Sequence, residues 1–236
     1  SKTYQFDLPL VQAAQAQKHV TVNEALARLD ALAQLRVISA DVVAPPADAL
    51  DGQMYIVPAG AQADWSGQDG SLALVANGGW AYVAPKRGWQ IWNEALAAAQ
   101  VYDGDAWISN AIHVSPSGAA TIARVVETEH TVGTGPTSVI QGAIPEGAVV
   151  IGVSARVRTA LGGTASSWSL GVPDSANRYG SGLGIQQDAF ANGLTGQPQA
   201  YYAATDLVIT ADDGALDGGT VTVAVHILQL EPPRTA

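Results

Sequence analysis

Only one stretch of this chain carries a helical pattern, and this restriction is the strongest constraint on its fold. Thr21 is followed three residues later by Glu24, an arrangement typical of a capping box at the start of a helix. Behind it an apolar stripe of helical spacing runs toward Val37, where β-branched residues take over. The sequence therefore predicts a single helix that ends near Val37. The stripe consists of Val22, Leu26, Leu29, Ala33 and Leu35.

The apolar stripe needs a surface to pack against, and the sequence leaves two possibilities open. It packs on a sheet of the same chain, or it meets copies of itself in a symmetric oligomer. Low charge favours sizeable subunit contacts, because only 14% of the residues are charged and an isolated protein normally exposes more Lys and Glu. Leu32 and Leu35 widen the apolar face, so both contacts are compatible. The predicted oligomer contact is Val22, Leu26, Leu29, Leu32 and Leu35.

Short strands and glycine turns follow the predicted helix. Gln53–Val57 is an apolar run between a turn and a proline, which is typical of a strand. Asn77-Gly78 and Asp103-Gly104 supply the positive φ angles that tight hairpin turns require. We therefore predict a small β-meander on which the helix lies, forming an α+β unit over residues 1–114.

A change of composition at Ser115–Gly118 indicates a linker, and from Ala119 onward alternating apolar residues replace the helical signal. Long alternating strands with glycine-rich connections are typical of an antiparallel sandwich or jelly roll. We therefore predict a mainly β chain with one N-terminal helix, in which a jelly-roll-like β-sandwich occupies 119–236. The residues expected to face its core are Val149, Ile151, Val153 and Val157 in one strand and Val221, Val223, Val225 and Ile227 in another.

The segment from Trp168 to Tyr202 interrupts the alternation because it is polar, rich in glycine and aromatic. Loops of this length in a compact β domain usually carry function or are ordered by a neighbour. Aromatic rings with nearby Asp, Asn and Arg form a composition that suits a sugar. The alternative is that the rings fill the core or a subunit interface. The candidates for glycan or receptor binding are Trp168, Asp174, Asn177, Arg178, Tyr179, Tyr201 and Tyr202.

No arrangement of catalytic or metal-binding residues is evident in the sequence. The chain has no cysteine, which excludes disulfides and thiolate metal sites. No nucleophile elbow, P-loop or dinucleotide fingerprint is present. We therefore predict no enzyme activity, no catalytic residue, no cofactor and no metal ion. The four histidines are dispersed at His19, His113, His130 and His226, and the last of these is expected to have a partner within the sheet.

Six aspartates of the second half offer carboxylates, but no spacing singles out the facing pair of a glycosidase. Asp212-Asp213-Gly214 and Asp217-Gly218-Gly219 are typical of turns in which Asp bonds its own backbone. The same oxygen-rich cluster leaves a Ca²⁺ site open as an alternative. The six residues are Asp174, Asp188, Asp206, Asp212, Asp213 and Asp217.

The charge and hydropathy of the chain exclude two classes of partner. A formal charge of −10 with scattered Lys and Arg argues against nucleic acid, since phosphate binding requires clustered basic residues. No apolar run reaches the roughly 18 residues that a membrane-spanning helix needs, so we expect no membrane insertion. The segment Ser1–Tyr4 carries no apolar core of a signal peptide, and we expect no export by that route.

Four segments of residues 8–108 carry a resemblance to a known family. In order they are LPLVQAAQAQKHVTVNEALARLDALAQ, DGQMYIV, GGWAYVAPKRGW and VYDGDAWI. This region resembles a domain of unknown function that occurs in gene transfer agents of alphaproteobacteria and in related tailed phages. The region from Ile144 to Gln229, with Arg178–Gly182 and Tyr201–Thr205, is similar to the β domain that often follows it in phage-type fibres and spikes.

The resemblance implies a structural virion protein, a head spike or tail fibre. Its N-terminal part would attach to other virion proteins, and its C-terminal β domain would bind polysaccharide on the host surface. Proteins of this kind are generally homotrimers, assembled in the host cytoplasm and exposed on the released particle. Two alternatives stay open: a purely architectural cement or adaptor protein, and a capsule-degrading endoglycosidase.

Overall fold

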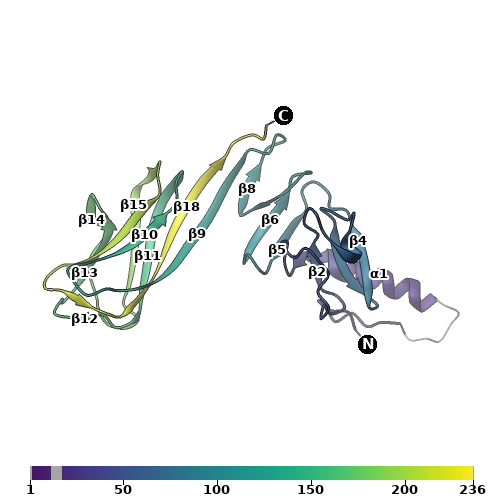
Figure 1. Cartoon of the computed structure of the whole chain (residues 1–236), viewed down its shortest axis with the longest axis horizontal. Helices are drawn as coiled ribbons and strands as arrows, with labels where there is room; N and C mark the ends of the chain where they lie inside the picture. The colour runs from purple at the N-terminus through teal and green to yellow at the C-terminus, as the bar shows by residue number, and fades with distance from the viewer. Residues whose placement is uncertain (1, 12–17, 236) are drawn as a thin grey trace. The chain divides into compact units, whose positions relative to one another are not determined.

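The computed structural model describes residues 2–11 and 18–235 (Figure 1). The chain divides into two compact units, residues 1–118 and 119–236, called here the N-terminal and C-terminal units. The residues of the predicted linker, Ser115–Gly118, form the end of the N-terminal unit. That the two units have separate roles stays a prediction. Within the described residues, no helix is long and apolar enough to cross a membrane.

Helix α1 (Lys18–Ala33) ends earlier than the sequence predicts. Arg36 and Val37, which the prediction placed at its end, form strand β1 instead and pair in parallel with β5 (Gln90–Asn93). Because residues 18–20 are already helical, Thr21 lies inside the helix and the predicted capping box with Glu24 is wrong. The apolar pattern of the sequence continues past the end of the helix, because Leu35 belongs to the same core as Val37 of β1.

Two small sheets complete the N-terminal unit. One has the order β2-β3-β4 and the other the order β1-β5-β6-β7, in which all pairs except β1 with β5 are antiparallel. At the β3–β4 turn Asn77 and Gly78 have φ angles of 55° and 71°, which confirms the predicted tight hairpin. The remaining elements are β2 (Met54–Ile56), η1 (Ala63–Trp65), β3 (Leu72–Ala76), β4 (Gly79–Val83), β6 (Ala98–Tyr102), β7 (Trp107–Ser109) and β8 (Ala111–Val114).

The two sides of β2 and β3 face two separate cores. Leu72 and Leu74 pack with Leu35 and Ala31, which ties the end of α1 to the sheet. On the other side Trp65 is fully buried, and Trp80 meets it edge to face with ring centroids 5.1 Å apart. Strands with apolar residues on both faces explain why β2 and β3 are continuous apolar runs in the sequence.

The C-terminal unit is built from eight longer strands and one short two-stranded ribbon, β12 (Gly162–Gly163) with β17 (Leu216–Asp217). The eight strands form one sheet of order β10-β16-β13-β14 and a second that contains the order β15-β11-β18-β9. They are β9 (Ala120–Thr131), β10 (Thr137–Ile144), β11 (Ala148–Thr159), β13 (Trp168–Val172), β14 (Ser175–Leu183), β15 (Phe190–Tyr201), β16 (Thr205–Ala211) and β18 (Thr220–Glu231).

This strand order is that of a jelly roll. Numbered along the chain, the first of the eight strands pairs with the eighth, the second with the seventh, the third with the sixth and the fourth with the fifth, all antiparallel. A long hairpin rolled onto itself produces this pairing and places two sheets face to face. Figure 1 shows the two layers, with β13 and β14 in one and β9, β11 and β18 in the other. The predicted antiparallel sandwich is confirmed.

Side-chain alternation follows the prediction in one strand and departs from it in another. In β18 the residues from Val221 to Ile227 that were expected to face the core are buried. In β11, Val153 and Val157 are buried as predicted, but Val149 is half-buried and Ile151 is 40% exposed. A β-bulge between Val150 and Gly152 shifts the register by one residue. The prediction is therefore wrong for Val149 and Ile151, because a bulge reverses the face of every residue on one side of it.

The segment from Trp168 to Tyr202 is not a long loop, and that prediction is wrong. It forms β13, β14 and β15. Two of its glycines allow neighbouring backbones to approach closely, and they do not mark a flexible loop. A Cβ on Gly193 of β15 would lie 2.1 Å from the Tyr179 carbonyl oxygen of β14, and a Cβ on Gly171 would lie 2.0 Å from the Ser175 carbonyl oxygen. Gly193 thus lies where the edge strands of the two sheets meet, and Gly171 lies at the close β13–β14 hairpin of one sheet.

Candidate functional site

The seven residues predicted to bind a glycan do not form one surface. Trp168 is fully buried in the jelly-roll core and donates its indole N–H to the Gly184 carbonyl oxygen at 2.9 Å. Tyr179 is 2% exposed. These two rings fill the core, which is the alternative that the sequence left open, and they have no surface to offer a ligand. Three of the seven are exposed, namely Asp174, Asn177 and Tyr202, and two are half-buried, namely Arg178 and Tyr201.

Tyr179 and Tyr201 are the two candidates that the structure brings together. Their hydroxyl oxygens lie 2.8 Å apart, which joins strand β14 of one sheet to strand β15 of the other. Burial, and after it the hydrogen bond with Tyr201, raises the pKa of Tyr179 far above its usual range. A phenol held neutral in this way is suited to a structural contact between the sheets, and not to proton transfer.

The acidic turn of the C-terminal unit is held by serines from a distant part of the chain. Asp212 accepts hydrogen bonds from the hydroxyls of Ser167, at 2.6 Å, and Ser169. Asp213 accepts from the Ser166 amide at 2.7 Å and the Ser166 hydroxyl at 2.9 Å. These hydrogen bonds lower the pKa of both carboxyl groups. The prediction that they bond their own turn is therefore incomplete, since their main partners lie more than 40 residues earlier.

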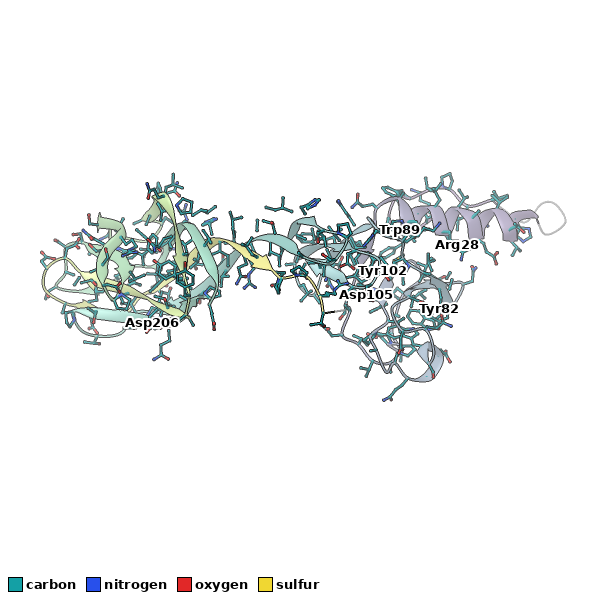
Figure 2. The ribbon with its side chains drawn as sticks, turned by 90° about the horizontal axis from the view of Figure 1, so that it is seen from above. Arg28, Tyr82, Trp89, Tyr102, Asp105 and Asp206 are labelled. Carbon is teal, nitrogen blue, oxygen red and sulfur yellow. The ribbon has the colours of Figure 1, made fainter. Side chains whose placement is uncertain are left out.

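Two further aspartates hold irregular backbone. Asp206, labelled in Figure 2, accepts a hydrogen bond from the Gly142 amide at 2.7 Å, at the register shift between β10 and β16. Asp217 accepts one from the Thr134 hydroxyl at 2.7 Å. Within residues 2–11 and 18–235, no group of three or more His, Cys, Asp or Glu side chains is placed to hold a metal ion. The carboxylates of Asp206, Asp212, Asp213 and Asp217 thus stabilise turns and bulges.

Helix α1 has three distinct faces. The side chains of Asp30 and Ala31 are buried on one face, and Thr21, Glu24 and Arg28 form an exposed polar face. The third face is apolar and also exposed: Val22 is 42% and Leu29 is 58% exposed. Ala25 and Ala33 continue this face at helical spacing and are exposed as well. We call Val22, Ala25, Leu29 and Ala33 the α1 stripe.

The predicted oligomer contact therefore divides into two groups. Val22 and Leu29 lie on the α1 stripe, so the alternative that they pack on this chain's own sheet is wrong. Leu26 is half-buried and adjoins the stripe. Leu35 lies beyond the helix and is buried with Met54 in the chain's own core, against which Leu32 also packs. Leu35 is thus removed from the predicted contact by the early end of the helix.

A different face of α1, which includes Asp30, holds the N-terminal segment through polar contacts. The Asp30 carboxylate accepts hydrogen bonds from the Thr3 hydroxyl at 2.7 Å and from the amides of Gln5 and Phe6, each at 2.8 Å. Asn23, two turns earlier on the helix, pairs through its side-chain amide with both backbone groups of Val11. Residues 3–11 are therefore anchored along the helix at two points.

Asp30 is a buried carboxylate that stays ionised. Burial opposes its charge and acts to raise its pKa, but the hydrogen bonds from Gln5, Thr3 and Phe6 outweigh burial and the pKa lies below its ordinary value. A lowered pKa means that the carboxylate stabilises the folded state at neutral pH. No periodic apolar pattern marks Asp30, so sequence reasoning missed it.

Grooves border α1 on the side of the β3–β4 hairpin. One, with a volume of about 630 Å³, is lined by Glu24 and Arg28 from the helix and by Leu74 and Trp80 from the strands. Figure 2 shows Arg28 on the helix. The groove is open and mixed in polarity, and it lies beside the α1 stripe. It therefore adds area to any surface that packs on the helix.

A second concave surface lies on the face of the β15-β11-β18-β9 order that points away from the jelly-roll core, called here the outer sheet face. Its pocket of about 220 Å³ is lined by Arg156, Arg158, Phe190, Asn192 and Glu127 with small residues between them. Arg156 and Arg158 flank the inward Val157, and this alternation alone places them on the solvent face of their strand. Local sequence could not show the residues of β9, β15 and β18 beside them, because the strand pairs join residues 34 to 111 positions apart.

Residues 22–108 match the model of a family described as "Protein of unknown function (DUF2793)". The matched segment begins within α1 and ends in β7, so it lies in the N-terminal unit and covers less than half of the chain. This match confirms the resemblance of the N-terminal region to a family of unknown function. The link to gene transfer agents and to fibre proteins stays a prediction.

Among solved structures, the chain is similar to one described as "Cyanophage Pam1 capsid asymmetric unit". The identity is 25% over 46% of this chain and 86% of the matched chain, with a TM-score of 0.33. A TM-score of this size does not indicate a shared fold, so nothing about this chain follows from it. A search of curated proteins gives no match.

Proposed function

We propose that this chain is a non-enzymatic structural protein of a phage-type particle that associates with copies of itself through helix α1. In this proposal the N-terminal unit attaches to other virion proteins, and the C-terminal jelly roll faces outward and binds polysaccharide on the host surface. The protein is a head spike or tail fibre subunit and forms a homotrimer. It is assembled in the host cytoplasm and carried on the released particle.

The observation that supports the proposal most is the exposed α1 stripe. Full burial of a leucine side chain contributes about 1.5–3 kcal/mol, which Leu29 does not gain within its own chain because 58% of it stays exposed. Val22 and Leu29 are one heptad apart, the spacing at which helices pack along a shared axis. The N-terminal segment packs on a different face of the helix, at Asp30 and Asn23, and leaves the stripe uncovered.

A structural role is also supported by the chemistry of the carboxylates. Asp206, Asp212, Asp213 and Asp217 all accept hydrogen bonds that stabilise turns or bulges. A glycosidase instead needs two carboxyl groups facing each other across a cleft, about 5–10 Å apart. An adhesive role, by contrast, needs only an exposed surface on a rigid scaffold, which a jelly roll provides.

The test of this function is binding of the full chain to host cells. Fluorescently labelled protein should bind intact cells of the host, lose binding when the capsule is removed, and be detected in purified particles by mass spectrometry. Presence in particles without binding to cells or capsule would favour an architectural cement or adaptor protein. Release of reducing ends from purified capsule would instead show an endoglycosidase and contradict the non-enzymatic proposal.

A further inference from the structure

We infer that the outer sheet face of the jelly roll is a binding site for an acidic sugar, a saccharide unit that carries a carboxylate. The inference rests on the proposed function, and it names both the surface and the chemical class of the ligand. The site is distinct from the region around Asn177 and Arg178, which lies on strand β14 of the other sheet.

Two arginines provide the positive charge of this site. Arg156 and Arg158 project from the same face of β11, and both are exposed. Neither arginine forms an ion pair with a carboxylate within residues 2–11 and 18–235. They are two of only five basic residues in 119–236, in a protein of formal charge −10. An anion is therefore the complementary ligand for this face.

Both guanidinium groups are held in place. Arg156 donates from Nη1 to the Asp188 carbonyl oxygen at 3.0 Å, and its Cζ lies 5.5 Å from the centre of the Phe190 ring. Arg158 donates from Nε to the Thr222 hydroxyl at 2.9 Å. These contacts use part of each guanidinium and leave further N–H groups for a ligand, since arginine has five donors. A preorganised guanidinium binds a carboxylate in bidentate geometry with little additional loss of entropy.

The strand register explains why the surface is hollow. Across the sheet, Asn192, Ser154, Ala224 and Glu127 are directly opposite one another on β15, β11, β18 and β9. The two central side chains, Ser154 and Ala224, are small and form a floor, and the two outer ones, Asn192 and Glu127, are longer and form walls. Adjacent strands are about 4.8 Å apart, so the small floor is bordered by walls roughly 14 Å apart. That width accommodates one flat ring.

The walls of the hollow match the other groups of a sugar. Phe190 is 64% exposed, although a phenyl ring is usually buried, and it offers an apolar face to the C–H side of a pyranose. Asn192 and Glu127 line the hollow and can hydrogen-bond hydroxyl groups. Glu127 also opposes the arginines, so a ligand with both a carboxylate and hydroxyls suits the site better than an inorganic anion.

The size of the hollow predicts weak binding for each sugar unit. Its volume of about 220 Å³ is below the roughly 300–1,000 Å³ of drug-sized pockets. A single sugar should therefore bind with a Kd on the order of 1 mM. Repeated acidic units on a polysaccharide and several copies of the site in an oligomer would raise the apparent affinity by about 10²–10⁴-fold.

The test is titration of the full chain with galacturonate tetrasaccharide and, as the neutral match, maltotetraose, followed by NMR or calorimetry. We expect binding of the acidic tetrasaccharide, at least tenfold weaker binding in Arg156→Ala and Arg158→Ala, and partial retention in Arg158→Lys. Arg178→Ala is the matched control on the other sheet and should bind like the wild type. Circular dichroism melting curves of each variant establish that it is folded.

Three results would overturn the inference. If the arginine variants bind the acidic tetrasaccharide as well as the wild type, the ligand lies elsewhere while the proposed adhesive function stands. If the arginine variants change the oligomeric mass instead of sugar binding, the outer sheet face is a contact between copies of the chain. If the wild type binds neither tetrasaccharide nor purified host polysaccharide, both the inference and the adhesive function fail.

Discussion

The jelly roll encloses large apolar side chains in its core, whereas helix α1 exposes an apolar stripe and buries a carboxylate. Within the jelly roll Trp168, Leu170 and Leu207 are fully buried. On α1 the buried face contains the carboxylate of Asp30, and Leu29 is exposed. Both regions come from one weakly charged chain, so composition alone does not explain the contrast.

The contrast teaches which part of the chain is complete by itself. A closed sandwich satisfies its own apolar residues and gains no further stability from a partner at its core. A helix whose apolar stripe is exposed gains stability when another surface covers the stripe. We therefore expect substitutions in the jelly roll to change folding, and those on the α1 stripe to change association.

Removal of a jelly-roll core side chain should have the largest effect on folding. We expect Leu207→Ala to reduce the free energy of unfolding of the C-terminal unit by about 2–5 kcal/mol, because it opens a cavity at a fully buried position. Leu194→Ala, on an outward and 79% exposed residue of the same unit, should change it by less than about 0.5 kcal/mol. Hydrogen exchange of β16 peptides in increasing urea measures both, and equal effects would show that the core is not where the structure places it.

Disruption of the close contact between β14 and β15 should have the next largest effect on stability. Gly193→Ala places a methyl group 2.1 Å from the Tyr179 carbonyl oxygen, and backbone cannot move aside as a flexible side chain would. Overpacking of this kind costs about 1–3 kcal/mol. Gly196→Ala, at a position where a Cβ meets open space, is the matched control on the same strand. If both variants unfold at the same urea concentration, the sheets do not meet at Gly193.

Acid should release the N-terminal segment from α1. The pKa of Asp30 is lowered in the folded state, so its stabilising effect is complete above the unfolded pKa of about 3.9 and is lost as pH falls through the folded value. Hydrogen-exchange protection of residues 2–11 should be high at pH 6 and should fall below pH 4. At pH 6, Asp30→Ala should lower protection by about 1–3 kcal/mol, because it leaves buried donors unpaired. If Asp30→Ala leaves the hydrogen-exchange protection of residues 2–11 unchanged, Asp30 does not hold the N-terminal segment on α1.

Loss of the hydrogen bond between the Tyr179 and Tyr201 hydroxyls should have the smallest effect on stability. Tyr201→Phe removes the partner of the buried Tyr179 hydroxyl and should destabilise the jelly roll by about 0.5–1.5 kcal/mol. Tyr202→Phe, on the next residue, which is 88% exposed, should have no measurable effect. An identical urea midpoint for the two variants would show that the pair contributes nothing to stability.

Sequence periodicity predicted the elements that local rules control. The Asn77-Gly78 hairpin and the inward face of β18 were both predicted, because turn chemistry and strict alternation are visible within a few residues. The sandwich followed from several such strands. The early end of α1 was not predicted, since Leu35 continues the apolar stripe although it packs as part of a different element.

The candidate site was less accessible to sequence reasoning, for two physical reasons. A bulge at Ile151 inverts side-chain direction without any change in the apolar pattern. Glycines such as Gly193 are typical of loops, yet here they permit backbones to approach. Aromatic residues near polar ones suit either a sugar platform or the core, and composition does not separate the two. Trp168 and Tyr179 are in the core, and Phe190 is an exposed ring beside an arginine.

Self-association through the α1 stripe is the central claim, and sedimentation velocity of the full chain tests it most directly. The account predicts an oligomer, with a trimer as the expected mass, that Leu29→Glu dissociates because each copy loses its leucine and places a charge in the contact. Val20→Glu adds the same charge at an exposed valine of the same helix, roughly 180° around the helix from Leu29, and should leave the mass unchanged. A wild-type protein that sediments as a monomer at every concentration would contradict the claim.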